Sequence, residues 1–173
     1  SMIATLLELD PYLGRVLTGR IHTGNAEINA PLKAITQSGS VIEHGRIRKL
    51  LAFRGLERVP VVKATAGDLI AIAGLSTATV SDTLADPSIV KPIPAPPIDP
   101  PILAMTFSIN NSPLAGTEGT KVTSRAIRDR LRREVDGNVA IQLTESETKD
   151  AFEVAGRGEL QLGVLIEQMR REG

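Results

Sequence analysis

The chain has 173 residues, of which 42% are hydrophobic, and its 20 basic and 20 acidic side chains balance, so overall charge favours no class of partner. It contains no cysteine, which excludes a disulfide framework and a cysteine-ligated zinc site. No apolar run approaches the roughly 20 residues that span a bilayer, and with three Phe, one Tyr and no Trp any nucleic-acid surface must be a local basic patch rather than an aromatic stacking platform.

The chain before residue 92 has the pattern of short strands. At the start of the chain, one face of a predicted strand carries Ile3, Thr5, Leu7 and Leu9, and the other carries Ala4, Leu6, Glu8 and Asp10. Further runs rich in Val, Ile and Leu predict strands at 15–22, 32–36, 46–53, 59–64 and 69–73. Turn residues separate them, at Gly24-Asn25, Gly39-Ser40, Gly55 and Gly67-Asp68. Short strands at this spacing, without a helical period, predict a small closed β-barrel over residues 1–91, because closure removes exposed strand edges.

A proline-rich segment follows the strand region. Six of the eleven prolines lie between Pro92 and Pro101, in the run KPIPAPPIDPP. Proline fixes the φ angle and lacks a backbone donor, so this run excludes a helix or an inner strand. We therefore expect a semi-rigid linker over residues 92–101 and a domain boundary there.

After the linker the period changes. The sequence predicts a strand at 102–109, a polar loop at 110–119 and a helix at 121–135 with Ile127, Leu131 and Val135 on one face. Two strands, 139–143 and 151–155, flank a polar turn at 144–150, and a second helix follows Gly158 and stops at Gly173. The order β-α-β-β-α predicts a ferredoxin-like α+β domain over residues 102–173 that lacks its last strand.

The sequence offers few residues for catalysis or cofactor binding. A phosphate-binding P-loop is missing, because the nearest text, residues 115–122, has the wrong glycine spacing and no hydroxyl after Lys121. Gly156-Arg157-Gly158 imitates a dinucleotide fingerprint, but the third glycine position holds Gln161, so a tight strand-to-helix turn is favoured over a phosphate site. The two histidines, His22 and His44, make a weak metal or catalytic site without cysteine. We thus predict no catalytic, cofactor or metal residue in this chain, which we expect not to be an enzyme by itself.

The first predicted helix carries the most suggestive charges. At about 100° per residue, Arg125, Arg128 and Arg132 lie together, opposite Ile127 and Leu131. Arginine pairs with phosphate oxygens through two hydrogen bonds, so this face predicts contact with RNA or an acidic partner. The alternative is a solvated face whose charges pair within the helix, Arg125 with Asp129 and Asp129 with Arg133.

Several motifs in order resemble a known family. Residues 14–21, GRVLTGRI, resemble the signature of the second domain of translational GTPases, and residues 66–75, AGDLIAIAGL, resemble its closing strand. Residues 81–84, SDTL, resemble the following G-D-T-L, with Ser81 in place of the usual glycine. Residues 107–116, FSINNSPLAG, and 156–162, GRGELQL, look specifically like the TypA/BipA family, although Gln161 replaces a histidine found in elongation factor G.

The resemblance covers residues 3–172 and implies domains II and III of an elongation-factor-like GTPase. It implies a cytoplasmic, ribosome-associated protein of large-subunit assembly and stress growth, whose GTP and Mg²⁺ are held by a G domain outside this chain. It also implies contacts with the ribosome, with the G domain and with a C-terminal domain of the same protein. Ser1 before Met2 is typical of a residue left by tag removal, and we expect the chain to be cut from a larger protein.

Three hypotheses for function remain open at this point. The chain is a ribosome-docking module of a GTPase, a free-standing enzyme that uses His22 or His44, or an interaction module that binds only the rest of its own protein.

Overall fold

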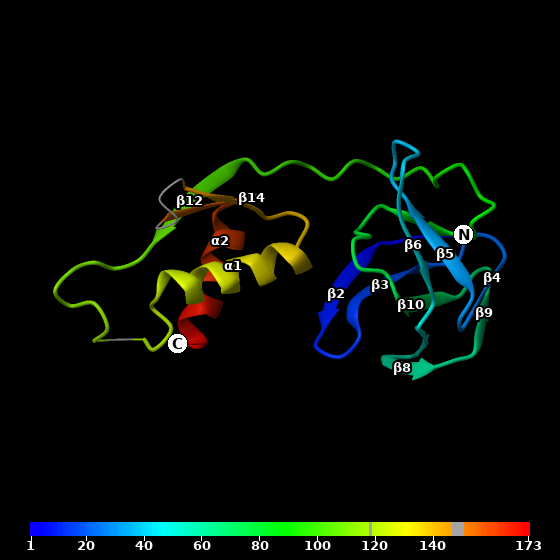
Figure 1. Ribbon diagram of the computed structural model, residues 1–173, viewed down its shortest axis with the longest axis horizontal. Coiled ribbons are helices and arrows are strands. Elements are labelled where there is room, and N and C mark those ends of the chain that lie inside the picture. The colour runs from blue at the N-terminus through cyan, green and yellow to red at the C-terminus, as the bar shows by residue number, and fades with distance from the viewer. Residues whose placement is uncertain (118, 147–150) are drawn as a thin grey trace. The chain divides into compact units, whose positions relative to one another are not determined.

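The computed structural model describes residues 1–117, 119–146 and 151–173 (Figure 1). The chain divides into two compact units, Ser1–Pro97 and Ile98–Gly173. The division falls inside the proline-rich segment. The finer bounds of the linker, residues 92–101, stay a prediction.

The first unit is built from strands alone. Their bounds are β1 Met2–Ile3, β2 Leu6–Asp10, β3 Gly14–Arg20, β4 Asn25–Glu27, β5 Pro31–Ile35, β6 Val41–Arg46, β7 Lys49–Arg54, β8 Glu57–Pro60, β9 Lys63–Thr65, β10 Leu69–Ala73 and β11 Thr83–Ala85. A four-stranded sheet has the order β1-β11-β5-β6, and a five-stranded sheet has the order β2-β3-β10-β7-β8. The short strands β4 and β9 pair with each other.

The two larger sheets enclose one apolar core. The alternation of side chains along a strand places Leu17, Leu50 and Ile70 of the five-stranded sheet on one face, where they meet Leu32 and Leu84 of the other sheet. An isolated bridge between Met2 and Ile21 joins the sheets at one corner. Backbone hydrogen bonds among the described strands therefore form two sheets that are linked at one corner. This arrangement confirms the predicted β-barrel fold class.

A side-chain contact joins the two edges of the five-stranded sheet. Arg58 on edge strand β8 pairs with Glu8 on the opposite edge strand β2, with Nη2 2.7 Å from Oε1. The Arg58 guanidinium also lies 5.2 Å from the ring centroid of Phe53. Phe53 in turn packs against a second, smaller apolar cluster formed by Val16, Ala71 and Ala73. The two edge strands are therefore joined by side chains, since no backbone hydrogen bonds pair β2 with β8 in the described sheet.

Several strand predictions need correction. The expected strand at 46–53 is two strands, because the chain turns at Ile47 and Arg48 between β6 and β7. The expected strand at 59–64 likewise divides into β8 and β9. Strands β4, β6 and β11 were missed because they are short or polar, and their pairing with distant partners defines them. Strand β10 lies where the sequence predicted it.

The second unit has a three-stranded sheet covered by two helices. Its elements are β12 Leu103–Ser108, α1 Ser124–Gly137, β13 Gln142–Glu145, β14 Ala151–Gly156 and α2 Glu159–Arg171. Both helices lie on one side of the sheet (Figure 1). Their buried Leu131, Leu162 and Leu165 pack against Phe152 and Val154 of β14. The described elements follow the predicted order β-α-β-β-α.

The strand order β12-β14-β13 leaves one edge of β12 unpaired among the described residues. This is the sheet of a ferredoxin-like domain without its fourth strand, as predicted. Element bounds differ from the prediction by up to three residues, most at two starts. Helix α1 begins at Ser124 rather than 121, and β13 begins at Gln142 because residues 139–140 form a turn. Part of the predicted turn at 144–150 lies outside the described residues.

Candidate functional site

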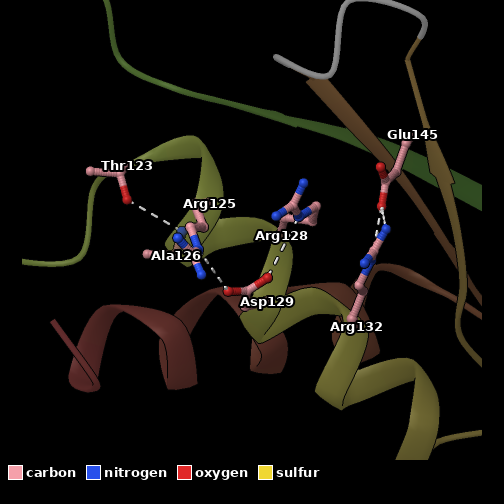
Figure 2. A network of polar contacts seen from close by, with 7 residues as sticks. All are labelled: Thr123, Arg125, Ala126, Arg128, Asp129, Arg132 and Glu145. Atoms are coloured by element: carbon pink, nitrogen blue, oxygen red, sulfur yellow. Dashed lines mark hydrogen bonds and ion pairs between the residues drawn. The ribbon is translucent and has the colours of Figure 1, made fainter.

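Helix α1 presents the predicted arginines. Its start is set by Thr123, whose hydroxyl accepts a hydrogen bond from the backbone nitrogen of Ala126 at 3.3 Å (Figure 2). Leu131 anchors the opposite face in the core and is 1% exposed. The cap and this anchor fix the rotation of the helix, and hence which arginines reach the surface.

The three predicted arginines differ in exposure and in pairing (Figure 2). Arg125 is 85% exposed, and its Nε lies 3.8 Å from Oδ2 of Asp129. Arg132 is 56% exposed and donates to Oε1 of Glu145 from Nε at 2.9 Å and from Nη2 at 2.6 Å. Arg128 is only 31% exposed, with Nε 3.5 Å from Oδ1 of Asp129. The helix therefore offers Arg125 freely, Arg132 through exchange with Glu145, and Arg128 least.

Both the helical spacing and contacts with other elements determine which charged residues of α1 form ion pairs. The expected pair of Arg125 with Asp129 is present, whereas the second ion pair of Asp129 is with Arg128 rather than Arg133. Arg130 turns inward, where it is 14% exposed and bonded to Glu134 of its own helix and to Glu172 beyond α2. Arg130 thus ties the two helices together and is removed from the surface, while Arg133 stays exposed beside Arg132.

The β-barrel carries a second group of arginines that sequence reasoning missed. An open groove of about 980 Å³ is lined by Arg15, His44, Arg46 and Arg48 among others. Arg46 Nη1 donates to the carbonyl oxygen of Asn29 at 2.9 Å, and Arg15 Nη1 donates to that of Ala78 at 3.1 Å. Both arginines are thereby oriented by backbone carbonyls. Arg46 and Arg48 flank the buried Ile47, and this alternation is the sequence signal that could have found them.

Glu43, which also lines this groove, accepts hydrogen bonds from the loop that follows β10. Its two carboxylate oxygens accept hydrogen bonds from Ser76 and Thr77, through backbone nitrogens and hydroxyls at 2.6–3.0 Å. Burial raises the pKa of Glu43, but these hydrogen bonds outweigh burial and lower the pKa to about 2. The carboxylate is therefore charged at neutral pH and holds the loop after β10 to strand β6.

The glycine motif before α2 is a turn, as the sequence favoured. Gly156 ends β14 and α2 begins at Glu159. Gln161 reaches back, and its Oε1 accepts a hydrogen bond from the backbone nitrogen of Arg157 at 2.7 Å. A Cβ on Gly156 would lie 2.9 Å from that same oxygen. Gly156 and Gln161 therefore close the turn together, which is a structural role.

Neither histidine belongs to a cluster of possible metal ligands in the described part of the chain. His22 follows β3, His44 lies in β6, and both are exposed. Within residues 1–117, 119–146 and 151–173, no group of three or more His, Cys, Asp or Glu side chains could hold a metal ion. Neither helix of this described part is long and apolar enough to cross a membrane.

Comparisons with known proteins add a family context to this geometry. A family model described as elongation factor Tu domain 2 matches residues 13–85. Relatives described as large ribosomal subunit assembly factor BipA are 47% identical in Synechocystis over 98% of this chain, 46% in Salmonella typhimurium over 100% and 44% in Escherichia coli O157:H7 over 100%. The chain spans about 28% of the length of these relatives.

A solved structure supports the fold alone. A crystal structure of a protein from Thermus thermophilus covers 98% of this chain with a TM-score of 0.65 and 17% identity, and the match takes up 24% of that protein.

Proposed function

This chain belongs to the TypA/BipA family, and from that premise we propose that it is the non-catalytic part of such a protein that docks on the ribosome. The observation that carries the proposal is the 42–47% identity, over nearly the whole chain, to relatives described as large ribosomal subunit assembly factors. In this proposal GTP and Mg²⁺ are bound by a G domain elsewhere in the parent protein, which works in the cytoplasm. The two units described here couple that domain to ribosomal RNA and protein in translation or subunit assembly, including under stress.

We place the RNA contact on the exposed arc of α1. Arg125 is the best placed of the predicted arginines, because an ion pair of 3.8 Å at an 85% exposed side chain contributes little and yields easily to a phosphate. Arg132 contributes after leaving Glu145, and Arg128 contributes least. With so few aromatic residues in the chain, such binding depends on phosphate and shape and is weakly selective for sequence.

The barrel groove supports the same function from the first unit. Arg15 and Arg46 are fixed by backbone carbonyls, so their guanidinium groups lose little freedom on binding an anion. Glu43 lines the same groove and is charged at neutral pH, so its carboxylate offsets part of the attraction that these arginines offer to an anion. Each unit would thus contribute a basic surface of its own to phosphate binding.

Salt-dependent co-sedimentation with ribosomes tests the α1 surface. The variant R125Q/R128Q/R132Q removes three positive charges without adding negative ones. If all three arginines touch phosphate, the log–log salt slope of binding should fall by about two units. The matched variant R54Q/R170Q/R171Q removes the same charge from exposed positions elsewhere, and we expect it to keep a slope close to that of the wild type.

The alternative is an interaction module that binds only other domains of its own protein. One observation favours it, because all three arginines already have carboxylate partners within the second unit. It predicts that the triple variant binds ribosomes with the wild-type slope, while the same changes in the full-length protein reduce its stability. That pair of results would refute RNA docking through α1.

A further inference from the structure

The first residues of the proline-rich segment are hydrogen-bonded to the β-barrel. Gln37, in the turn between β5 and β6, donates from Nε2 to the carbonyl oxygen of Ile93 at 3.0 Å. Its Oε1 accepts from the backbone nitrogen of Ala95 at 3.0 Å. One carboxamide therefore binds the extended backbone on both sides of Pro94, in the way that a neighbouring strand would.

A buried threonine completes the attachment. The hydroxyl of Thr83 in β11 accepts a hydrogen bond from the backbone nitrogen of Ile93 at 2.8 Å, and Thr83 is 0% exposed. Ile93 and Ala95 supply the only backbone N–H groups between Pro92 and Pro97, since the other residues there are prolines. Both N–H groups are thus accepted by barrel side chains.

Gln37 is itself held in place. Its Nε2 also donates to the carbonyl oxygen of Ser81 at 2.6 Å. The turn that carries it is closed by Thr36, whose carbonyl oxygen accepts from the nitrogen of Gly39 at 2.9 Å and whose hydroxyl accepts from the nitrogen of Ser40 at 3.1 Å. A side chain fixed at its base and at its tip loses little further freedom when it binds the linker.

We propose that Gln37 and Thr83 form a latch that holds the start of the semi-rigid proline-rich segment on the barrel and leaves only a short, stiff spacer free. With residues 93–95 attached to the barrel, the free span is residues 96–101, Pro-Pro-Ile-Asp-Pro-Pro. Four prolines in six residues favour the polyproline II conformation, which rises about 3.1 Å per residue, so the span reaches roughly 19 Å. The latch sets where this spacer starts and restricts the range of separations open to the second unit.

Amide exchange tests the latch directly. In the variant Q37A, exchange at Ala95 should speed up by about threefold or more, because the loss of one net hydrogen bond changes a local opening equilibrium by roughly that factor. The variant T83V, which keeps the shape of the side chain, should do the same at Ile93. Exchange at Asp99, in the free span, is the internal reference, and Q142A changes an exposed glutamine of the second unit as a matched control.

Distance measurements test the spacer. The chain has no cysteine, so spin labels can be placed uniquely at L56C and L160C, which are 103% and 83% exposed in the two units. We expect a narrower distance distribution in the otherwise unchanged chain than in Q37A. Unchanged exchange at Ile93 and Ala95 would overturn the latch. Faster exchange with an unchanged distance distribution would overturn the spacer.

Discussion

Arg132 and Glu145 meet through a single oxygen, since Nε and Nη2 of the arginine donate to Oε1 of the glutamate at 2.9 and 2.6 Å. The pair joins helix α1 to strand β13, which places an acid from the sheet beside the basic surface of the helix. Arg132 must therefore exchange one anion for another before it can contact RNA.

Releasing Arg132 should strengthen RNA binding. In E145Q the carboxylate that competes with phosphate for Arg132 is removed, so the affinity for ribosomes at a fixed salt concentration should rise. The control E153Q removes an exposed acid from the neighbouring strand β14 and so changes the net charge equally. An equal affinity in E145Q and E153Q would show that Arg132 does not contact phosphate.

The stability contributed by Glu43 should disappear in acid. Its folded pKa of about 2 lies below its ordinary value of 4.5, so the unfolded chain binds the proton more readily. The stabilisation is fully present above pH 4.5 and is lost as pH falls towards 2. We expect E43Q to lower the free energy of unfolding at pH 7 by on the order of 2 kcal/mol. Urea unfolding should show that difference shrinking between pH 4.5 and 2, and a constant difference would contradict this account.

Gly19 should tolerate no side chain. A Cβ there would lie 1.9 Å from the carbonyl oxygen of Ile3 and 2.8 Å from Cε of Met2, because β1 crosses β3 at this point. We expect G19A to destabilise the barrel by about 1 to 3 kcal/mol or more in thermal unfolding. G163A is the control, since nothing lies within 4 Å of its Cβ in helix α2, and it should stabilise the protein by up to about 1 kcal/mol.

Ser81 should be improved by glycine. Its φ angle is 71°, in the left-handed region that costs an ordinary residue roughly 1–2 kcal/mol. This conformation explains why the related motif has glycine at this position. We expect S81G to raise the free energy of unfolding by about 0.5–1 kcal/mol after the larger entropy of glycine in the unfolded chain is counted. N29G, at φ 66°, should change stability less because asparagine tolerates this region. A loss of stability in S81G would refute the explanation.

The chain by itself should not bind GTP. No segment has two glycines spaced to cradle a phosphate ahead of a Lys-Ser or Lys-Thr pair. Calorimetry with GTP and Mg²⁺ should show no heat of binding. A micromolar dissociation constant would contradict the proposal that only the G domain binds GTP.

Local patterns in the sequence determined much of this protein. The apolar run at residues 69–73 predicted β10, the spacing of Ile127, Leu131 and Val135 predicted α1, and the prolines from 92 to 101 predicted the break between two units. Each of these signals is a property of neighbouring residues, because strand and helix periods and the restrictions of proline act within a few residues of the chain. The motifs that resemble the TypA/BipA family are equally local.

Only the tertiary structure decided which polar side chains work together. Gln37 and Ala95 are 58 residues apart, and Glu8 and Arg58 are 50 apart, so no period of the sequence connects them. The same holds for the arginines of α1. The helical period placed Arg125, Arg128 and Arg132 on one face, but Glu145 on strand β13 and the packing of the unit set how available each one is. The exposure and the ion pairs of a side chain depend on which residues from other elements lie next to it. Those neighbours are determined only when the strands and helices pack.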